Sequence, residues 1–175
     1  TPVDYFGRKM VDNLPDSIKV GTITVAVGGA SIDLFDKRTC KAYLKKQPDW
    51  MKNFASQYHG NPYARLIELA KIAQKQGVIK GILLHQGETN NGDTNWPNRV
   101  KTVYNDILKD LNLKAEDVPL LVGETVQKDQ GGKCWQHIAV VDDIAKTIPT
   151  AHVISSKGCP QRGDGLHFIA ESYRT

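Results

Sequence analysis

The sequence lacks several features that would assign a protein to a class at once. No apolar run approaches the roughly 20 residues that cross a bilayer, and no signal peptide stands at the N-terminus. Cysteine is scarce: Cys40, Cys134 and Cys159 are an odd number without CxxC spacing. Neither a structural zinc site nor a disulfide framework is indicated, although one oxidised pair, such as Cys134 with Cys159, stays open.

Internal repeats, low-complexity tracts and strong charge are also missing. The formal net charge of +4 comes from lysines scattered along the chain, without an aromatic-interleaved basic stripe, so the sequence disfavours a nucleic-acid partner. With 40% hydrophobic and 24% charged residues, the 175-residue chain has the composition of an ordinary globular protein. We expect one domain over residues 1–175 that buries a substantial core.

Apolar or β-branched runs alternate with amphipathic helical patterns, which predicts an α/β domain with a parallel, doubly wound sheet. The expected strands are residues 18–27, 78–84, 119–123 and 151–155. The expected helices begin at Thr1, Asn61 and Asn95 and lie around 138–145, with short helices in 39–58. Because a helix in such a domain normally follows a strand, the opening helix suggests that a first strand is missing upstream.

The run from Val78 to Leu84 ends abruptly in the polar group His85 to Asn90. A central parallel strand is apolar on both faces, and ligands gather where such strands end. We therefore expect site chemistry at Gln86 and Glu88. A solvated turn would also explain the glycine and asparagine of this segment.

Two further strand ends carry polar or glycine-rich groups. Gly28 and Gly29 follow the expected strand 18–27, and paired glycines let backbone N–H groups approach an oxyanion. Taken alone, these glycines fit a tight turn that needs positive φ somewhat better. Asp164 precedes His167 by three residues beyond the last strand. Such a carboxylate can hold the imidazole by its Nδ1–H and leave Nε2 as a general base.

In this order, the segments GGASI, LLHQGETN and DGLHF resemble the later motifs of the SGNH hydrolase superfamily, in particular carbohydrate esterase family 6 and the sialate O-acetylesterase-like group. The resemblance runs from about Tyr5 to Tyr173. It implies a flavodoxin-like α/β/α sandwich and removal of O-acetyl groups from plant polysaccharides such as xylan. It also implies a secreted or periplasmic location and no cofactor or metal.

By position, Asp164 and His167 resemble the acid and base of this family. Gly28 or Gly29 and Gln86 resemble its oxyanion donors, and Glu88 resembles a supporting acid. The nucleophilic serine of the family lies in an upstream Gly-Gln-Ser-Asn type motif that this sequence lacks. We therefore expect a chain truncated at both ends, with a nucleophile that precedes Thr1.

Internal serines are poor substitutes for that nucleophile, and two other functions stay open. Ser31 lacks the following glycine of a nucleophile elbow, and Ser155 and Ser156 suit a polar turn. A glycosidase could use Glu88 with Glu124, because both follow strands. A noncatalytic carbohydrate-binding domain is the other alternative. In the esterase or the binding domain, Trp96 and Trp135 near the site loops would suit sugar stacking.

Overall fold

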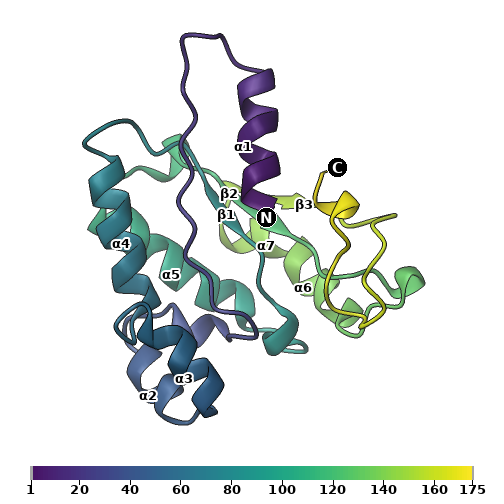
Figure 1. Cartoon of the computed structure of the whole chain (residues 1–175). Coiled ribbons are helices and arrows are strands. Elements are labelled where there is room, and N and C mark those ends of the chain that lie inside the picture. The colour runs from purple at the N-terminus through teal and green to yellow at the C-terminus, as the bar shows by residue number, and fades with distance from the viewer. Residues whose placement is uncertain (1, 175) are drawn as a thin grey trace.

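The computed structural model describes residues 2–174 and contains a small parallel sheet surrounded by helices (Figure 1). The α-helices are α1 (Pro2–Asp12), α2 (Cys40–Lys45), α3 (Asp49–Ser56), α4 (Pro62–Ala73), α5 (Trp96–Asp110), α6 (Ile138–Asp142) and α7 (Ile144–Thr147). The strands are β1 (Ile82–Leu84), β2 (Leu120–Gly123) and β3 (Ala151–Ile154). Single 3-10 turns are η1 (Ile32–Leu34), η2 (Glu88–Asn90), η3 (Ala115–Asp117), η4 (Lys128–Gln130), η5 (Trp135–His137) and η6 (Glu171–Tyr173). The predicted cap at Thr1 lies outside the described residues.

The three strands are parallel and lie in the order β1-β2-β3, so β2 is the central strand of the described sheet. The prediction that residues 78–84 form a central strand covered on both faces is wrong. Only Ile82–Leu84 pairs, with one neighbour, and Leu83 keeps 42% of its surface exposed. An edge strand has one hydrogen-bonding partner and packs less surface than a central one.

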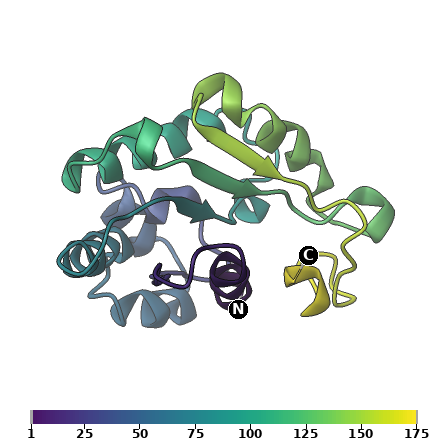
Figure 2. The ribbon, with the colours of Figure 1, turned by 90° about the horizontal axis from the view of Figure 1, so that it is seen from above.

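The helices cover the two faces of the sheet unequally. α5, α6 and α7 lie over one face, whereas α1 and α4 lie on the other side (Figure 2). Alternate strand residues enter the main core on the first face: Ile82, Leu84, Leu120, Val122, Ala151 and Val153. On the second face Ile154 stays 53% exposed. The predicted α/β class, with a parallel sheet flanked by helices, is confirmed.

The two strongest helix predictions are also confirmed. α4 begins where Asn61 accepts the N–H of Ala64 at 3.0 Å and Pro62 occupies the first turn. α5 buries the predicted apolar face, including Val100 and Val103, against the sheet. The helix expected around residues 138–145 is divided into the short helices α6 and α7.

A second, smaller core lies beneath α2 and α3. Val27, Ala30, Leu34, Cys40 and Met51 form it, and all five are buried. Because Val27 and Ala30 flank the paired glycines, this core attaches α2 and α3 rigidly to the glycine turn of residues 28–31.

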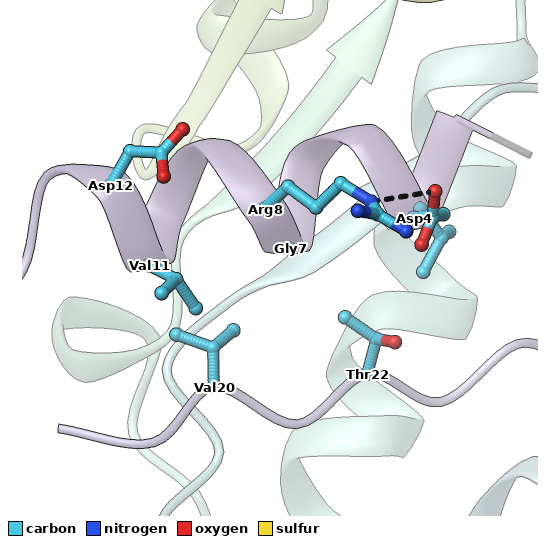
Figure 3. A pocket seen from close by; sticks show the side chains of 8 residues that line it. Asp4, Gly7, Arg8, Val11, Asp12, Val20 and Thr22 are labelled. Atoms are coloured by element: carbon cyan, nitrogen blue, oxygen red, sulfur yellow. Dashed lines mark hydrogen bonds and ion pairs between the residues drawn. The ribbon is translucent and has the colours of Figure 1, made fainter.

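Residues 18–27 are extended but do not form the predicted strand. Their β-branched composition suits an extended backbone, yet a strand also needs a hydrogen-bonding neighbour, and no strand of residues 2–174 pairs with this segment. The segment runs beside α1, where Val11 faces Val20 across a groove of about 350 Å³ (Figure 3). Within residues 2–174, no helix has the length and apolar character needed to cross a membrane.

Candidate active site

The Asp164–His167 pair lies on an exposed loop that follows β3. Asp164 Oδ2 is 2.7 Å from His167 Nδ1, so the predicted hydrogen bond is present. Asp164 Oδ1 accepts the backbone N–H groups of His167 and Leu166 at 2.9 and 2.8 Å. These bonds, from His167 first and then Leu166, hold the pKa of the Asp164 carboxyl well below its usual range. An ionised Asp164 accepts a hydrogen bond from the Nδ1–H group of His167. The Nε2 lone pair of His167 then remains free to act as a base.

Glycines and Gln161 give this loop its shape. Gln161 Oε1 accepts the backbone N–H groups of Gly163 and Gly165 at 2.6 and 2.8 Å. Gly165 has φ +75°, and a Cβ there would stand 2.9 Å from the carbonyl oxygen of Gly131, so a glycine is required. The carbonyl of Gly165 accepts the N–H of Lys133 at 2.9 Å. The Asp164–His167 pair is therefore held by bonds from Gln161 within its own loop and by a backbone bond to Lys133 in another segment.

Glu88 links this loop to the end of β1. Burial would raise the pKa of its carboxyl, but the hydrogen bond and charge of His85, with a smaller effect of His167, lower the pKa overall. His85 Nε2 lies 3.5 Å from Glu88 Oε1, and the His85 ring packs 5.9 Å from that of Phe168. Through His85, which contacts both Glu88 and the neighbour of His167 in the chain, Glu88 lies beside the loop of Asp164 and His167.

The side chain of Gln86 has a partner for every polar hydrogen. Its Nε2 donates to the carbonyl of Ala30 at 3.1 Å and to Asn90 Oδ1 at 2.8 Å, and its Oε1 accepts the indole N–H of Trp96 at 2.6 Å. Indole N–H only donates and a carbonyl only accepts, so the partners fix the amide orientation. The predicted use of Gln86 as an oxyanion donor is not met by this arrangement, because both amide hydrogens are already bonded.

Trp96 is fully buried and cannot stack on a sugar, so its predicted role in substrate binding is wrong. The sequence placed it near the site correctly, but the first turn of α5 points the ring inward, edge-on to His137 with ring centroids 4.9 Å apart. The contact with Gln86 makes Trp96 a support for the site loop.

The glycine turn lies against the same loop. Gly29, at φ +69°, accepts the Thr89 hydroxyl on its carbonyl at 2.8 Å, and Ile32 donates its N–H to Asn90 Oδ1 at 3.0 Å. Gly28 and Gly29 are exposed, so their backbone can be approached closely. The structure thus brings the predicted oxyanion turn and the Gln86 loop together.

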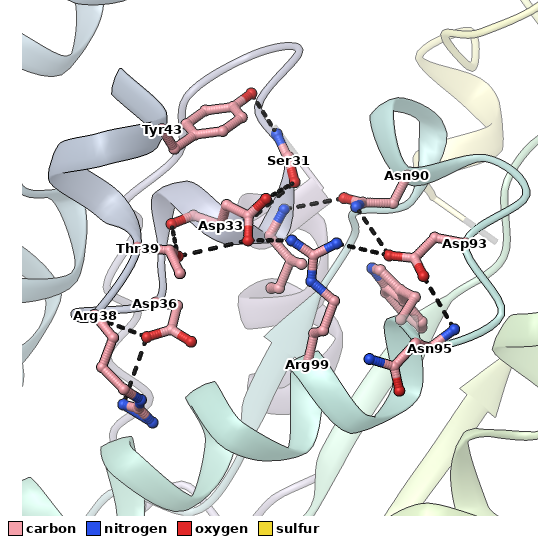
Figure 4. A network of polar contacts seen from close by, with 12 residues as sticks. Ser31, Asp33, Asp36, Arg38, Thr39, Tyr43, Asn90, Asp93, Asn95 and Arg99 are labelled. Atoms are coloured by element: carbon pink, nitrogen blue, oxygen red, sulfur yellow. Dashed lines mark hydrogen bonds and ion pairs between the residues drawn. The ribbon is translucent and has the colours of Figure 1, made fainter. Parts of the chain in front are cut away.

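An ion-pair network that sequence reasoning missed fastens these two loops. Arg99, on α5, contacts Asp33 beside the glycine turn and donates to Asp93 Oδ2 at 2.7 Å beyond the Gln86 loop (Figure 4). Asp93 in turn lies within 3.5 Å of Asn90 Nδ2. Asp33 and Arg99 are far apart in the chain and carry no spacing signal, so only the fold could reveal that Arg99 links the two loops.

The serines of the described site are engaged elsewhere. Ser31 is buried and caps η1, accepting the N–H of Asp33 at 3.3 Å. Ser155 and Ser156 both donate hydroxyl groups to Glu124 Oε2, at 3.2 and 3.1 Å. Glu124 is only 7% exposed and also accepts from Gln127, so it ties the end of β2 to the end of β3. This environment does not favour Glu124 as a glycosidase carboxylate.

Trp135 lies on the rim of this edge and is 36% exposed. Lys128 Nζ lies 4.5 Å from the centre of the indole, and both residues line a cavity of about 250 Å³ together with Asp142. Its predicted contact with substrate stays a prediction. Within residues 2–174, no group of three or more His, Cys, Asp or Glu side chains is arranged to hold a metal ion.

Comparisons with known proteins give a family match and a solved structure of similar fold. The sequence model described as "Carbohydrate esterase, sialic acid-specific acetylesterase" matches residues 1–175. A protein of Arabidopsis thaliana solved by X-ray crystallography has a similar fold, with a TM-score of 0.68 and 19% sequence identity. The alignment covers 99% of this chain but 61% of the Arabidopsis chain, so the present chain spans less than two thirds of that protein. The family match over the whole sequence shows that the chain belongs to the carbohydrate esterases of the sialic acid-specific acetylesterase family.

Proposed function

We propose that this protein acts in the hydrolysis of O-acetyl esters on carbohydrate, with acetylated xylan or a related plant polysaccharide as substrate. The observation that carries the proposal is the Asp164–His167 hydrogen bond on a loop at the carboxyl edge of the sheet. Family membership supports the reaction class. A secreted or periplasmic location would suit a polymeric substrate of this kind.

In the proposed reaction, His167 Nε2 removes the proton of a serine hydroxyl as the oxygen attacks the ester carbonyl. Asp164 stabilises the resulting imidazolium, and His167 then returns the proton to the departing sugar hydroxyl. Water repeats the sequence to release acetate. Both His167 and Asp164 are exposed enough to meet a large substrate, at 64% and 45% of their side-chain surface.

The serine in this scheme is one outside residues 2–174. Ser31 is buried in a capping bond, and Ser155 and Ser156 are bonded to Glu124, so the serines considered within the site are already engaged. In this proposal the nucleophile is a serine upstream of Thr1, as the resemblance to the family implies.

The glycine turn would stabilise the charge that develops on the ester oxygen. Backbone N–H groups of Gly28 or Gly29 are suited to this because the turn is exposed, and one such donor contributes about 10²–10³-fold to kcat. Gln86 is assigned to positioning, since its amide binds Ala30 next to that turn. Glu88 would support the imidazole electrostatically.

Acetate release from acetylated xylan by the complete gene product tests the proposal. His167→Ala should abolish release, and a fluorophosphonate probe should label one serine that the variant leaves unlabelled or labels slowly. The 175-residue chain alone should neither hydrolyse the substrate nor react with the probe. Full activity of the His167→Ala variant, or stoichiometric labelling of Ser31, would overturn the mechanism.

A further inference from the structure

Two large aromatic side chains stand exposed beside the glycine turn. Trp50 and Phe54 are 51% and 52% exposed, and they lie one helical turn apart on α3, with ring centroids 6.4 Å apart in an edge-to-face arrangement. On the adjacent face of the same helix, Met51 and Ala55 are buried at 2% and 0%. α3 therefore has one face in the small core and one aromatic face in solvent.

The aromatic face reaches the candidate active site through Trp50. A Cβ built on Gly29 would stand 3.3 Å from Trp50 Cη2, so the tip of the indole lies against the predicted oxyanion turn. The carbonyl of the same glycine binds Thr89, next to Glu88. Trp50 thus lies beside the predicted oxyanion turn, and Phe54 extends the aromatic surface away from it.

Hydrogen bonds from α2 and from a residue just beyond α3 fix the position of Trp50 beside the glycine turn. Tyr43, on α2, accepts the backbone N–H of Ser31 at 3.0 Å, and Tyr58, just beyond α3, donates to the carbonyl of Ala26 at 3.3 Å. Both bonds join the helices to residues that flank the glycine turn. Preorganised aromatic side chains lose little conformational entropy when a ligand binds.

From these contacts we infer that Trp50 and Phe54 form a stacking platform for the sugar chain that carries the acetyl group, a subsite that selects polymer over free acetyl ester. The inference rests on the proposed function for the class of ligand. Pyranose rings present flat C–H faces that pack on indole. An exposed aromatic pair that binds no ligand would instead promote self-association of the protein. The site is open at the surface, as a polysaccharide chain requires.

The experiment measures binding of a deacetylated xylo-oligosaccharide to the protein by titration calorimetry, which needs no ester hydrolysis. Trp50→Ala should weaken binding by about tenfold, the loss expected for one stacked aromatic. Trp50→Phe should restore part of the affinity, and Phe54→Ala should weaken binding less than Trp50→Ala does. Ile72→Ala is the matched control, because Ile72 is 48% exposed on α4 and should leave affinity unchanged.

Three results would overturn the inference. The first is that the unaltered protein does not bind the oligosaccharide, and the second is that Trp50→Ala binds it with equal affinity. The third is a self-association in sedimentation experiments that Trp50→Ala abolishes, because the aromatic face would then be an interface between two copies. The two proposals can fail separately. Oligosaccharide binding that depends on Trp50, without acetate release by the complete protein, would refute only the esterase mechanism. Acetate release from the polymer with unchanged affinity in Trp50→Ala would refute only the platform.

Discussion

The contact between Trp96 and Gln86 makes a sharp stability prediction. In Trp96→Phe, the six-membered ring stays while the indole N–H is lost, so Gln86 Oε1 loses the donor that lies 2.6 Å away. An acceptor left without a partner in a buried site costs about 1–3 kcal/mol. The missing part of a fully buried ring adds on the order of 1–2 kcal/mol through the space it leaves.

We therefore expect a loss of about 3 kcal/mol in the free energy of unfolding. For a domain of this size, that loss lowers Tm by roughly 6–12 °C. Thermal and urea unfolding followed by circular dichroism measure it. Trp135→Phe is the matched control, because the same atoms are removed from a half-exposed ring and the change should stay within about 0.5 kcal/mol.

A double-mutant cycle separates the hydrogen bond from the packing. In a Gln86→Leu background the orphaned acceptor no longer exists, so Trp96→Phe should cost about 1–2 kcal/mol less than it does in the unaltered protein. If Trp96→Phe costs under about 0.5 kcal/mol, or costs the same in both backgrounds, Trp96 does not hold Gln86 and the assigned positioning role is refuted.

Three further predictions concern residues around the same loops. Asp164→Asn should lower kcat of the complete enzyme by about 10⁴-fold with little change in Tm, because the charge that orients His167 is lost and the shape is kept. A larger loss of kcat in Glu88→Gln would show that Glu88, and not Asp164, is the acid that orients the histidine. Burial lowers the pKa of His137 in the folded protein, although the charges of Glu88 and Asp93 oppose this shift. As the pH falls, the imidazole of the unfolded chain is therefore protonated at a higher pH than that of the folded protein. This difference favours unfolding, so Tm should fall as the pH drops below about 6.5. His137→Leu should flatten the Tm profile between about pH 6.5 and 5, and an unchanged profile would contradict a neutral buried imidazole. Gly87→Ala should destabilise the fold by at least about 1 kcal/mol, since φ is +156° and a Cβ would stand 2.5 Å from His137 Cδ2; chemical denaturation showing no loss would mean that the loop moves freely.

Local sequence patterns determined the elements that form from residues close together in the chain. The cap at Asn61 with Pro62, and the regular apolar face of α5, predicted two helices correctly because backbone propensity and amphipathic spacing act within a few turns. The Asp164–His167 bond followed in the same way from a separation of three residues. The family motifs placed these groups at one edge of a parallel sheet.

Tertiary structure decided whatever depended on a distant partner. Residues 18–27 have strand composition, but a strand forms only beside another backbone, and the segment is unpaired within residues 2–174. Trp96 was expected to face the ligand, yet packing in the core turned it inward to bind Gln86, whose amide is saturated as a result. The Arg99 network and the contact of Trp50 with Gly29 join segments far apart in the chain. Composition and spacing cannot encode such contacts, because the free energy that selects them comes from packing and charge pairing in the folded chain.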